Sequence, residues 1–215
     1  MSTILSIEGN IGSGKSTIIN YLKEKYSDSG NIILLPEPVE EWEKIKDNDG
    51  QTILEKFYGN QQKYSFAFQM MAYISRLDIL RKAIKENPGK IIISERSLYT
   101  DKYVFAQMLY DDNKMESVEY QIYNNWFHSF SDLAPLHKVV YLKTDPNVSY
   151  DRIMKRNRTG EDCIPFDYIQ NCHKYHENMY DIIDCSKKIV DCTIDFNHSN
   201  DYFEKISQDI LSFLK

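Results

Sequence analysis

The stretch Ile4–Ser16 reads Ile-Leu-Ser-Ile-Glu-Gly-Asn-Ile-Gly-Ser-Gly-Lys-Ser and decides the fold. An apolar strand leads into Gly9–Ser16, which matches the phosphate-binding pattern G-x-x-x-x-G-K-[ST]. In such a loop the glycines let backbone N–H groups converge on a phosphate chain, Lys15 reaches the outer phosphates and the Ser16 hydroxyl ligates magnesium. A glycine-containing turn capped by Ser16 or Thr17 is the alternative, and the complete motif after a strand favours nucleotide binding. The residues expected to contact the nucleotide here are Gly9, Asn10, Ile11, Gly12, Ser13, Gly14, Lys15, Ser16 and Thr17.

Length and net charge limit the classes of protein to which this chain can belong. The 215 residues suit one domain, residues 1–215, and the net charge is −6. Proteins that coat nucleic acid or an anionic membrane need a broad basic surface, so we expect neither a nucleic-acid polymer nor a membrane as partner. There is no C-x-x-C pair, no apolar stretch long enough for a bilayer and no basic leader, which predicts a reducing, cytoplasmic setting. The cysteines are Cys163, Cys172, Cys185 and Cys192.

Apolar runs alternate with helix-spaced segments along the chain. This alternation predicts an α/β fold, a parallel sheet with helices on both faces, and ligands then gather at the carboxyl ends of the strands. After the first strand, the expected strands are Ile32–Leu35, Ile91–Ser94, Val139–Leu142 and Ile189–Val190. The expected helical segments are Thr17–Tyr26, Gln51–Lys85, Ser97–Leu133, Pro146–Arg158, Phe166–Ile183 and Tyr202–Leu214.

Glu37 follows the second predicted strand and lies between Pro36 and Pro38, which restrict the backbone around it. A positioned carboxylate can accept the proton of a hydroxyl that attacks phosphorus. It would repel an acceptor that is already a phosphate, so Glu37 favours a hydroxyl acceptor. The alternative is a solvent-exposed loop glutamate, one of several acidic residues nearby.

Glu95 and Arg96 follow the third predicted strand. P-loop enzymes usually hold magnesium with an acidic residue at this position, so we expect Glu95 to do so, directly or through water. Arg96 would hold Glu37 or the transferring phosphoryl group. A structural ion pair at the end of the strand is the alternative.

Arg152, Lys155, Arg156 and Arg158 form a local basic cluster in an acidic chain. Arg152 and Arg156 are four residues apart and share a helical face, and Thr159-Gly160 is expected to end that helix. The pattern predicts an arginine-rich lid that neutralises charge on the phosphoryl oxygens in the transition state. A solvated basic face is the alternative.

Taken in order, these motifs resemble the deoxyribonucleoside kinase family, the group of deoxycytidine, deoxyguanosine and mitochondrial-type thymidine kinases. The resemblance covers nearly the whole chain. It is carried by Gly9–Thr17, Glu37-Pro38-Val39 with Trp42, Tyr64–Gln69, Glu95-Arg96-Ser97, Asp101 and the arginine lid that runs into Ile164-Pro165. It implies the P-loop nucleoside/nucleotide kinase fold, a parallel five-stranded sheet surrounded by helices, a homodimer, and magnesium with ATP or another nucleoside triphosphate as phosphate donor.

The resemblance also implies residue roles. Glu37 is then the base that activates the 5'-hydroxyl, Arg96 lies beside the 5' position, and Glu95 helps to place magnesium. Tyr58 and Glu161 correspond to positions that bind the sugar 3'-hydroxyl. The phosphate-handling residues are Lys15, Arg152, Arg156 and Arg158, and the residues that wall or stack the base are Trp42, Phe68 and Phe105. Gly160 departs from the family pattern, which commonly has an acid there, and glycine adds backbone freedom that lid closure must remove.

Gln69 and Arg76 lie seven residues apart, two turns along one helical face, and can face a single pocket. The Gln69 amide can meet the edge of any base, so selectivity must come from elsewhere. An ionised Asp101 only accepts hydrogen bonds, so it favours the amine of cytosine or adenine over the O4 carbonyl of thymine, and Arg76 would hold it in place. The Arg and Asp pair resembles the deoxycytidine and purine branch of the family, so we expect deoxycytidine or deoxypurines over thymidine.

Two other functions fit the phosphate loop. A nucleoside monophosphate kinase of the thymidylate type shares the loop, the sheet and an arginine lid. The Glu37 carboxylate argues against this function, because it would repel a phosphate acceptor. A nucleotide-dependent switch would usually carry N-K-x-D for guanine, which this chain lacks.

Overall fold

The computed structural model describes residues 2–26, 30–158, 161, 164–193 and 200–214. Its centre is a parallel five-stranded sheet, as predicted, and the strand order is β2-β3-β1-β4-β5. The strands are β1 (Thr3–Glu8), β2 (Ile32–Leu35), β3 (Ile91–Glu95), β4 (Lys138–Lys143) and β5 (Ser186–Asp191). β1 is central and almost wholly buried, whereas β2 is half-buried and β5 is largely exposed because both are edge strands.

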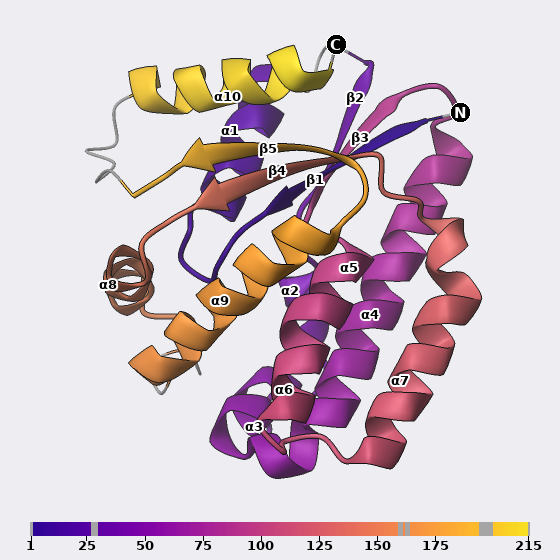
Figure 1. Cartoon of the computed structure of the whole chain (residues 1–215), viewed down its shortest axis with the longest axis vertical. Helices are drawn as coiled ribbons and strands as arrows, with labels where there is room; N and C mark the ends of the chain where they lie inside the picture. The colour runs from indigo at the N-terminus through magenta and orange to yellow at the C-terminus, as the bar shows by residue number, and fades with distance from the viewer. Residues whose placement is uncertain (1, 27–29, 159–160, 162–163, 194–199, 215) are drawn as a thin grey trace.

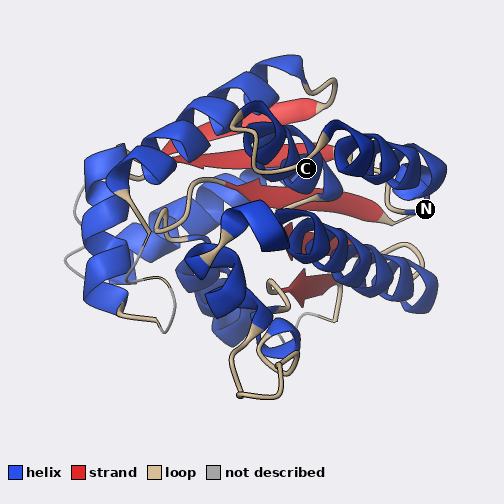
Figure 2. Cartoon of the chain, turned by 90° about the horizontal axis from the view of Figure 1, so that it is seen from below, coloured by secondary structure: helices blue, strands red, loops and turns tan. Residues whose placement is uncertain are grey.

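Helices cover both faces of the sheet (Figures 1 and 2). On one face, apolar residues of β1, β3, β4 and β5 form a core with α1 (Lys15–Tyr26) and α10 (Asn200–Leu214). On the other face, α4 (Gln61–Glu86), α5 (Leu98–Thr100) and α7 (Ser117–Phe130) pack against β1 and β3. The remaining helices are α2 (Val39–Trp42), α3 (Ile53–Gly59), the π-helix η2 (Asp101–Ala106), α6 (Gln107–Asp111), the 3-10 helix η3 (Ser131–Leu133), α8 (Pro146–Arg156) and α9 (Phe166–Ile182).

The predicted helix over Gln51–Lys85 is wrong in one respect, because the structure divides it into α3 and α4. Thr52 and Glu55 form a reciprocal capping box at the start of α3. Asn60 then interrupts the helix with φ −153°, and its side chain accepts a hydrogen bond from the Lys63 N–H at the start of α4. Helix-spaced apolar residues continue across this junction, so periodicity alone did not reveal it.

Two further helix predictions also need correction. Ser97–Leu133 is not one helix: it changes to the π-helix η2 at Asp101 and is interrupted between α6 and α7, where Asn113 has φ 54°. The helix that begins at Pro146 ends at Arg156, because Asn157 takes the left-handed conformation with φ 49°. Thr159 and Gly160, where the sequence predicted its end, lie outside the described residues.

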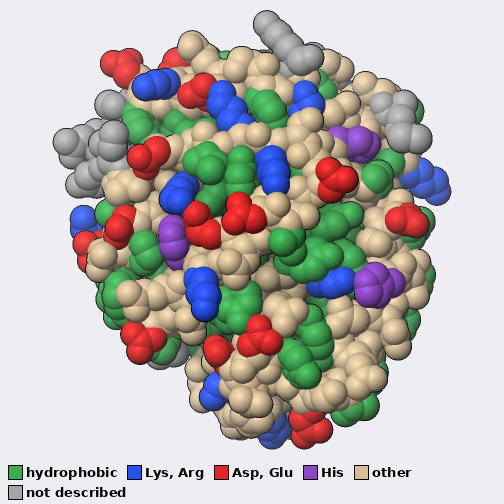
Figure 3. Space-filling model, viewed as in Figure 1, with side chains coloured by type: hydrophobic (Ala, Val, Ile, Leu, Met, Phe, Trp, Pro, Cys, Tyr) green, Lys and Arg blue, Asp and Glu red, His purple; other side chains and the backbone are tan. Residues whose placement is uncertain are grey.

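The topology brings the predicted motifs to one edge of the sheet. The loop after β1, the Pro36–Pro38 segment after β2 and Arg96 after β3 all follow the carboxyl ends of neighbouring strands. α8 follows β4 and lies beyond the same ends (Figure 1). In the face drawn in Figure 3, basic and acidic side chains are interspersed rather than gathered into one basic surface. Within the described ranges, every helix is too short or too polar to cross a bilayer.

Candidate active site

The phosphate loop joins β1 to α1, so the N-terminus of a 12-residue helix faces the carboxyl edge of the sheet. Such an N-terminus favours anions because its first N–H groups lack partners within the helix. Gly12 has φ 77°, and a Cβ atom at this position would lie 2.3 Å from the carbonyl oxygen of Ser149 on α8. Beyond the approach to phosphate that the sequence predicts, Gly12 therefore lets the loop pack against the arginine-bearing helix.

Lys15 is the first residue of α1 and is 95% buried, with an exposed fraction of 5%. Its Nζ donates to the backbone carbonyl of Asn10, at 2.7 Å, across the curled loop. Burial lowers the pKa of Lys15 to about 7, and the charge of Arg96 adds to the decrease. The Lys15 side chain is thus held inside the loop, where the charges of Glu95 and Glu37 oppose the decrease.

The Asn10 side chain makes two hydrogen bonds within the protein. Its Nδ2 donates to the carbonyl of Ile169 on α9 at 2.9 Å, and its Oδ1 accepts from the Ile11 N–H at 2.8 Å. The side chain therefore fastens the phosphate loop to α9, while the backbone of Asn10 remains part of the loop.

Ser16 and Glu95, the pair predicted to hold magnesium, are in contact. The Ser16 Oγ donates to Oε1 of Glu95 at 2.7 Å. Mg²⁺ bound with a nucleotide usually takes one or two protein oxygens together with phosphate oxygens and water. A hydroxyl from the phosphate loop and a neighbouring carboxylate fit that requirement.

Glu37 is held by two arginines. Oε1 of Glu37 lies 2.8 Å from Nη2 of Arg76 and 3.3 Å from Nε of Arg96. Oε2 makes no hydrogen bond within the described part of the chain, so one carboxylate oxygen is left for another donor. Burial alone would raise the pKa of Glu37, but the charges of Arg96, Arg76 and Lys15 outweigh it and lower the pKa to about 2. Glu37 is therefore a carboxylate over the whole physiological range and able to accept a proton.

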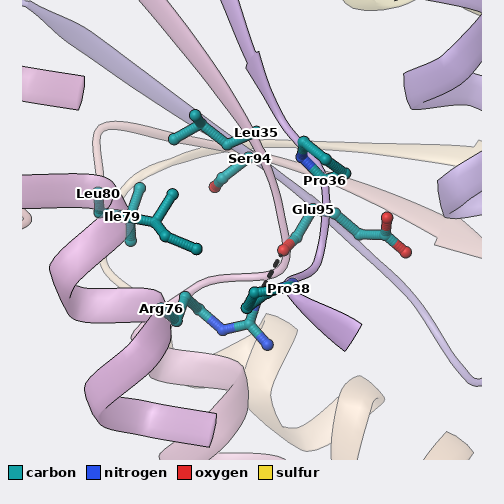
Figure 4. A pocket seen from close by; sticks show the side chains of 8 residues that line it. All are labelled: Leu35, Pro36, Pro38, Arg76, Ile79, Leu80, Ser94 and Glu95. Carbon is teal, nitrogen blue, oxygen red and sulfur yellow. Dashed lines mark hydrogen bonds between the residues drawn. The ribbon is translucent and has the colours of Figure 1, made fainter. Parts of the chain in front are cut away.

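Arg76 connects three parts of the site. Besides Glu37, its Nε donates to Oδ2 of Asp101 at 2.9 Å and its Nη1 donates to the backbone carbonyl of Glu95 at 2.7 Å. Figure 4 shows the guanidinium reaching from α4 towards Pro38, with the Glu95 carboxylate turned away from it. A cavity of about 10 Å³ beside Arg76, lined mainly by apolar side chains, has room for one water molecule at most.

Asp101 is the first residue of the π-helix η2 and is almost fully buried. π-helical turns are rare and often occur at functional sites. Burial raises the pKa of Asp101, and the neighbouring Arg76 opposes that increase. The structure thus brings the predicted pair Arg76 and Asp101 together as a buried ion pair and joins it directly to Glu37.

Two of the aromatic residues predicted to wall the base, Trp42 and Phe68, lie in one buried group. The rings of Trp42 and Phe68 meet edge to face at 5.6 Å, and Phe57 stacks on Phe68 at 4.5 Å. Gln69, one residue along α4, is 2% exposed, and its Oε1 has no hydrogen-bond partner among the described residues. The sequence analysis missed Phe57, because a single aromatic residue on a helix is indistinguishable from a core residue.

Tyr58 and Glu161, predicted near the sugar, are close enough for the charge of Glu161 to help raise the pKa of Tyr58. Tyr58 packs edge to face on Tyr168 at 6.4 Å, and burial raises its pKa well above the usual range, so its hydroxyl stays protonated. Glu161 is buried and binds two lid residues, with an ion pair to Arg156 and another to Arg158 at 3.3 Å. In this structure Glu161 therefore ties the lid arginines to one another.

The third lid arginine, Arg152, points elsewhere. Its Nη2 donates to the carbonyl of Cys192, just after β5, at 3.1 Å. The three arginines predicted to form the lid thus contact other groups of the protein, and the charge of Arg156 also acts on Lys15. Gly160, the departure from the family pattern, lies outside the described residues.

Phe105 and His176 lie on the other side of Arg96. The Cζ of Arg96 is 4.9 Å from the ring centroid of Phe105, and the Phe105 ring meets the His176 ring edge to face at 6.1 Å. Nη1 of Arg96 donates to the carbonyl of Gly9 at 2.9 Å and lies 3.2 Å from Nε2 of His176. His176 was not predicted from the sequence. The signal that could have revealed it is a polar residue on the apolar face of the Phe166–Ile183 segment.

Comparison with known proteins agrees with this arrangement. A family model described as deoxynucleoside kinase matches residues 5–215. A fowlpox virus protein named as a probable deoxycytidine kinase is 37% identical over 176 residues, which cover 80% of this chain and 69% of the relative. Human deoxycytidine kinase is 30% identical over an alignment of 237 residues, which covers 98% and 90% of the two chains. Deoxycytidine kinase 2 of Gallus gallus is 33% identical over 193 residues, covering 80% and 72%.

The family match extends from β1 to the end of the chain and includes the phosphate loop, the Glu37 segment, the Arg96 segment and the lid helix. Nothing in the family or in these relatives favours the monophosphate kinase that the sequence left open. The resemblance noted from the motifs is confirmed over almost the whole length, and this chain belongs to the deoxynucleoside kinase family.

Proposed function

We propose that this deoxynucleoside kinase transfers the γ-phosphoryl group of ATP to the 5'-hydroxyl of deoxycytidine or a deoxypurine nucleoside, in preference to thymidine. The kinase activity follows from the family. The observation that carries the base preference is the buried pair of Arg76 and Asp101 joined to Glu37. The relatives named as deoxycytidine kinases support the same preference.

In the proposed reaction Glu37 accepts the proton of the 5'-hydroxyl. Two arginines occupy Oε1, so Oε2 is the oxygen that receives the proton. With a pKa lowered to about 2, Glu37 is ionised near neutral pH. Arg96 lies beside the same carboxylate and steadies the 5' end of the nucleoside. A general base placed in this way contributes about 10²–10⁴-fold to the rate.

The donor site is assigned to the phosphate loop and the lid. Backbone N–H groups of the loop and Lys15 bind the phosphates, and Arg152, Arg156 and Arg158 neutralise charge that spreads over the transferring group. Ser16 and Glu95 would hold Mg²⁺, which would offset the negative charge of the phosphates. The hydrogen bond from Lys15 to the Asn10 carbonyl must break before Lys15 can bind the phosphates, because the ammonium group is turned into the loop.

Base recognition is assigned to Gln69 and Asp101 within the aromatic walls. The Gln69 Oε1 has no partner in the described structure and accepts a donor from the base edge. Asp101 uses Oδ2 for Arg76, which leaves Oδ1 for the exocyclic amine of cytosine or adenine. Thymine presents a carbonyl oxygen there, which is repelled by a carboxylate. Trp42, Phe68 and Phe105 enclose the base, and Tyr58 and Glu161 serve the 3'-hydroxyl.

We also propose that the chain is one kinase domain that acts as a homodimer in the cytoplasm. α7 exposes Val118, Ile122 and Trp126 in a stripe with a spacing of four residues, at 57%, 40% and 45% exposure. Ile74 on α4 is also exposed, and α4 contacts α7 through the buried Tyr73, whose hydroxyl donates to the Trp126 carbonyl at 3.2 Å. The three described cysteines are free, as expected in a reducing compartment, and Cys163 lies outside the described residues.

The test of function is a comparison of acceptors with magnesium ATP. We expect turnover of deoxycytidine, deoxyadenosine or deoxyguanosine with a larger kcat/KM than thymidine, and no turnover of the corresponding monophosphates. Thymidine as the best acceptor would contradict the base preference, and turnover confined to monophosphates would contradict the proposed acceptor. Measuring the rate with and without magnesium in the same assay tests the assigned metal.

A further inference from the structure

His176 is a fully buried histidine on α9 whose ring lies against the proposed catalytic centre. It stacks parallel to Tyr141 of β4 at 6.2 Å and meets Phe105 edge to face. Both ring nitrogens have a partner: Nδ1 lies 2.6 Å from the carbonyl oxygen of Cys172, and Nε2 lies 3.2 Å from Nη1 of Arg96. These two neighbours therefore decide which nitrogen of the buried imidazole carries the proton.

The neighbours fix the tautomer of His176. A carbonyl oxygen can only accept, so Nδ1 must carry the proton that bonds Cys172. A guanidinium can only donate, so Nε2 must be unprotonated and accept from Arg96. The charged form would place an N–H of Nε2 against Nη1 of Arg96. Burial, with the charge of Arg96, lowers the pKa of His176 well below its usual range, in agreement with the neutral ring.

Arg96 requires such support because of its backbone and its charge. Its φ is 64°, a left-handed conformation that is unfavourable for a residue other than glycine. Nη1 donates both to the Gly9 carbonyl at 2.9 Å and to His176, while Nε faces Oε1 of Glu37 at 3.3 Å. The side of the guanidinium away from Glu37 is therefore fixed by the phosphate loop and by α9.

We propose that His176 is a positioning residue for phosphoryl transfer, whose neutral Nε2 holds the Arg96 guanidinium against Glu37. The inference rests on the proposed function of Glu37 and Arg96. α9 also holds the phosphate loop through Asn10 and Ile169, at 2.9 Å. One helix thereby fixes both the donor loop and the arginine that faces the acceptor's hydroxyl, and small displacements of reacting groups cost large factors in rate.

Two substitutions separate this role from packing. His176→Phe keeps a ring of similar shape against Tyr141 and Phe105 but has no acceptor for Arg96. His176→Gln loses the ring, but its amide oxygen can reach the position of Nε2. If His176 positions Arg96, the Gln variant should retain kcat to within about threefold. The Phe variant should lower kcat by about tenfold or more, with little change in KM for either substrate. Lys174→Gln, which changes an exposed side chain on the same helix, is the control and should keep wild-type kcat.

A packing role predicts the opposite order, so kcat for the Phe variant equal to or above that of the Gln variant overturns the proposal. Circular dichroism melting establishes that each variant is folded. If the Phe variant does not fold, His176→Asn replaces it: its amide nitrogen can still bond Cys172, but its side chain stops short of Arg96. Equal kcat for the Asn and Gln variants would then overturn the proposal. Absence of deoxynucleoside turnover by the wild-type protein would instead refute the proposed function.

Discussion

Nη2 of Arg76 lies 2.8 Å from Oε1 of Glu37, so the arginine assigned to base selection also contacts the assigned catalytic base. Arg76 is 4% exposed and is neutralised by Glu37 on one side and Asp101 on the other. Removing one member of such a buried group leaves an uncompensated charge, which is strongly destabilising. A variant designed to change the base preference should therefore replace Arg76 together with an acidic partner.

The double variant Arg76→Met, Asp101→Ala removes both the acceptor that disfavours thymine and its counter-ion. We expect the ratio of kcat/KM for thymidine over deoxycytidine to rise by a factor that corresponds to about 1–3 kcal/mol, the usual value of one good base contact. Steady-state rates with both nucleosides measure it. Asp101→Asn, which keeps the side-chain size but can also donate to a carbonyl oxygen, is a second test and should raise the same ratio. An unchanged ratio would mean that the base is read by other residues.

Glu37→Gln tests the proposed base. Glutamine keeps the shape and can still accept a hydrogen bond from Arg76, but it cannot take a proton from the 5'-hydroxyl. We expect kcat to fall by about 10²–10⁴-fold, with deoxynucleoside affinity changed by less than about threefold, because proton transfer acts in the transition state. Glu40→Gln, on the exposed start of α2, is the matched control. Equal kcat for the wild-type and Glu37→Gln proteins would remove Glu37 from the mechanism.

The sequence predicted the fold and most of the assembled site because those features depend on local patterns. Apolar runs gave the strands, and the rule that parallel strands share a carboxyl edge placed Lys15, Glu37 and Arg96 together. The interruption at Asn60 was missed because apolar periodicity continues across it. The interruption at Asn113 was missed although it lies in the polar run Asp111–Lys114. Caps and left-handed residues decide where helices end, and those signals are weaker than periodicity.

The contacts that the sequence could not give are those between side chains distant along the chain. The Arg76 and Asp101 pair was expected, but the ion pair between Arg76 and Glu37 depends on how α4 packs against the loop after β2. The bond between His176 and Arg96 spans 80 residues and depends on the packing of α9 against β4. Hydrophobic periodicity places such residues on a face, but only the packed structure gives their neighbours.

Gln69→Leu tests base recognition without changing charge. The buried Oε1 of Gln69 has no partner among the described residues, so the free protein carries the cost of a desolvated amide oxygen, about 1–3 kcal/mol. Leucine removes that cost and is of similar size. We therefore expect Tm to stay the same or to rise, while KM rises about tenfold or more for every deoxynucleoside that the enzyme accepts. A parallel loss of Tm would indicate that Gln69 is structural instead.

Gly12→Ala tests the packing of the phosphate loop against α8. The added Cβ would meet the Ser149 carbonyl at 2.3 Å, and the backbone has φ 77°. Gly50→Ala is a matched control, because Gly50 has φ 82° and no heavy atom near the new Cβ. Left-handed strain alone costs about 1–2 kcal/mol, which we expect for Gly50→Ala. Gly12→Ala should lose more unfolding free energy and should also weaken ATP binding; equal losses in stability and unchanged ATP affinity would contradict the packing role.

Trp126→Glu tests the proposed homodimer. Trp126 is 45% exposed on α7, stacks on Phe130 at 5.3 Å and lies in the stripe with Val118 and Ile122. A charge at the centre of an apolar interface loses its hydration without gaining a partner, so association should be lost. Sedimentation equilibrium should give twice the chain mass of 25.4 kDa for the wild type and 25.4 kDa for the variant. Ile182→Glu, which changes a more exposed apolar residue at the end of α9, should leave the dimer intact. A monomeric wild type, or a Trp126→Glu protein that remains dimeric, would place the interface elsewhere or remove it.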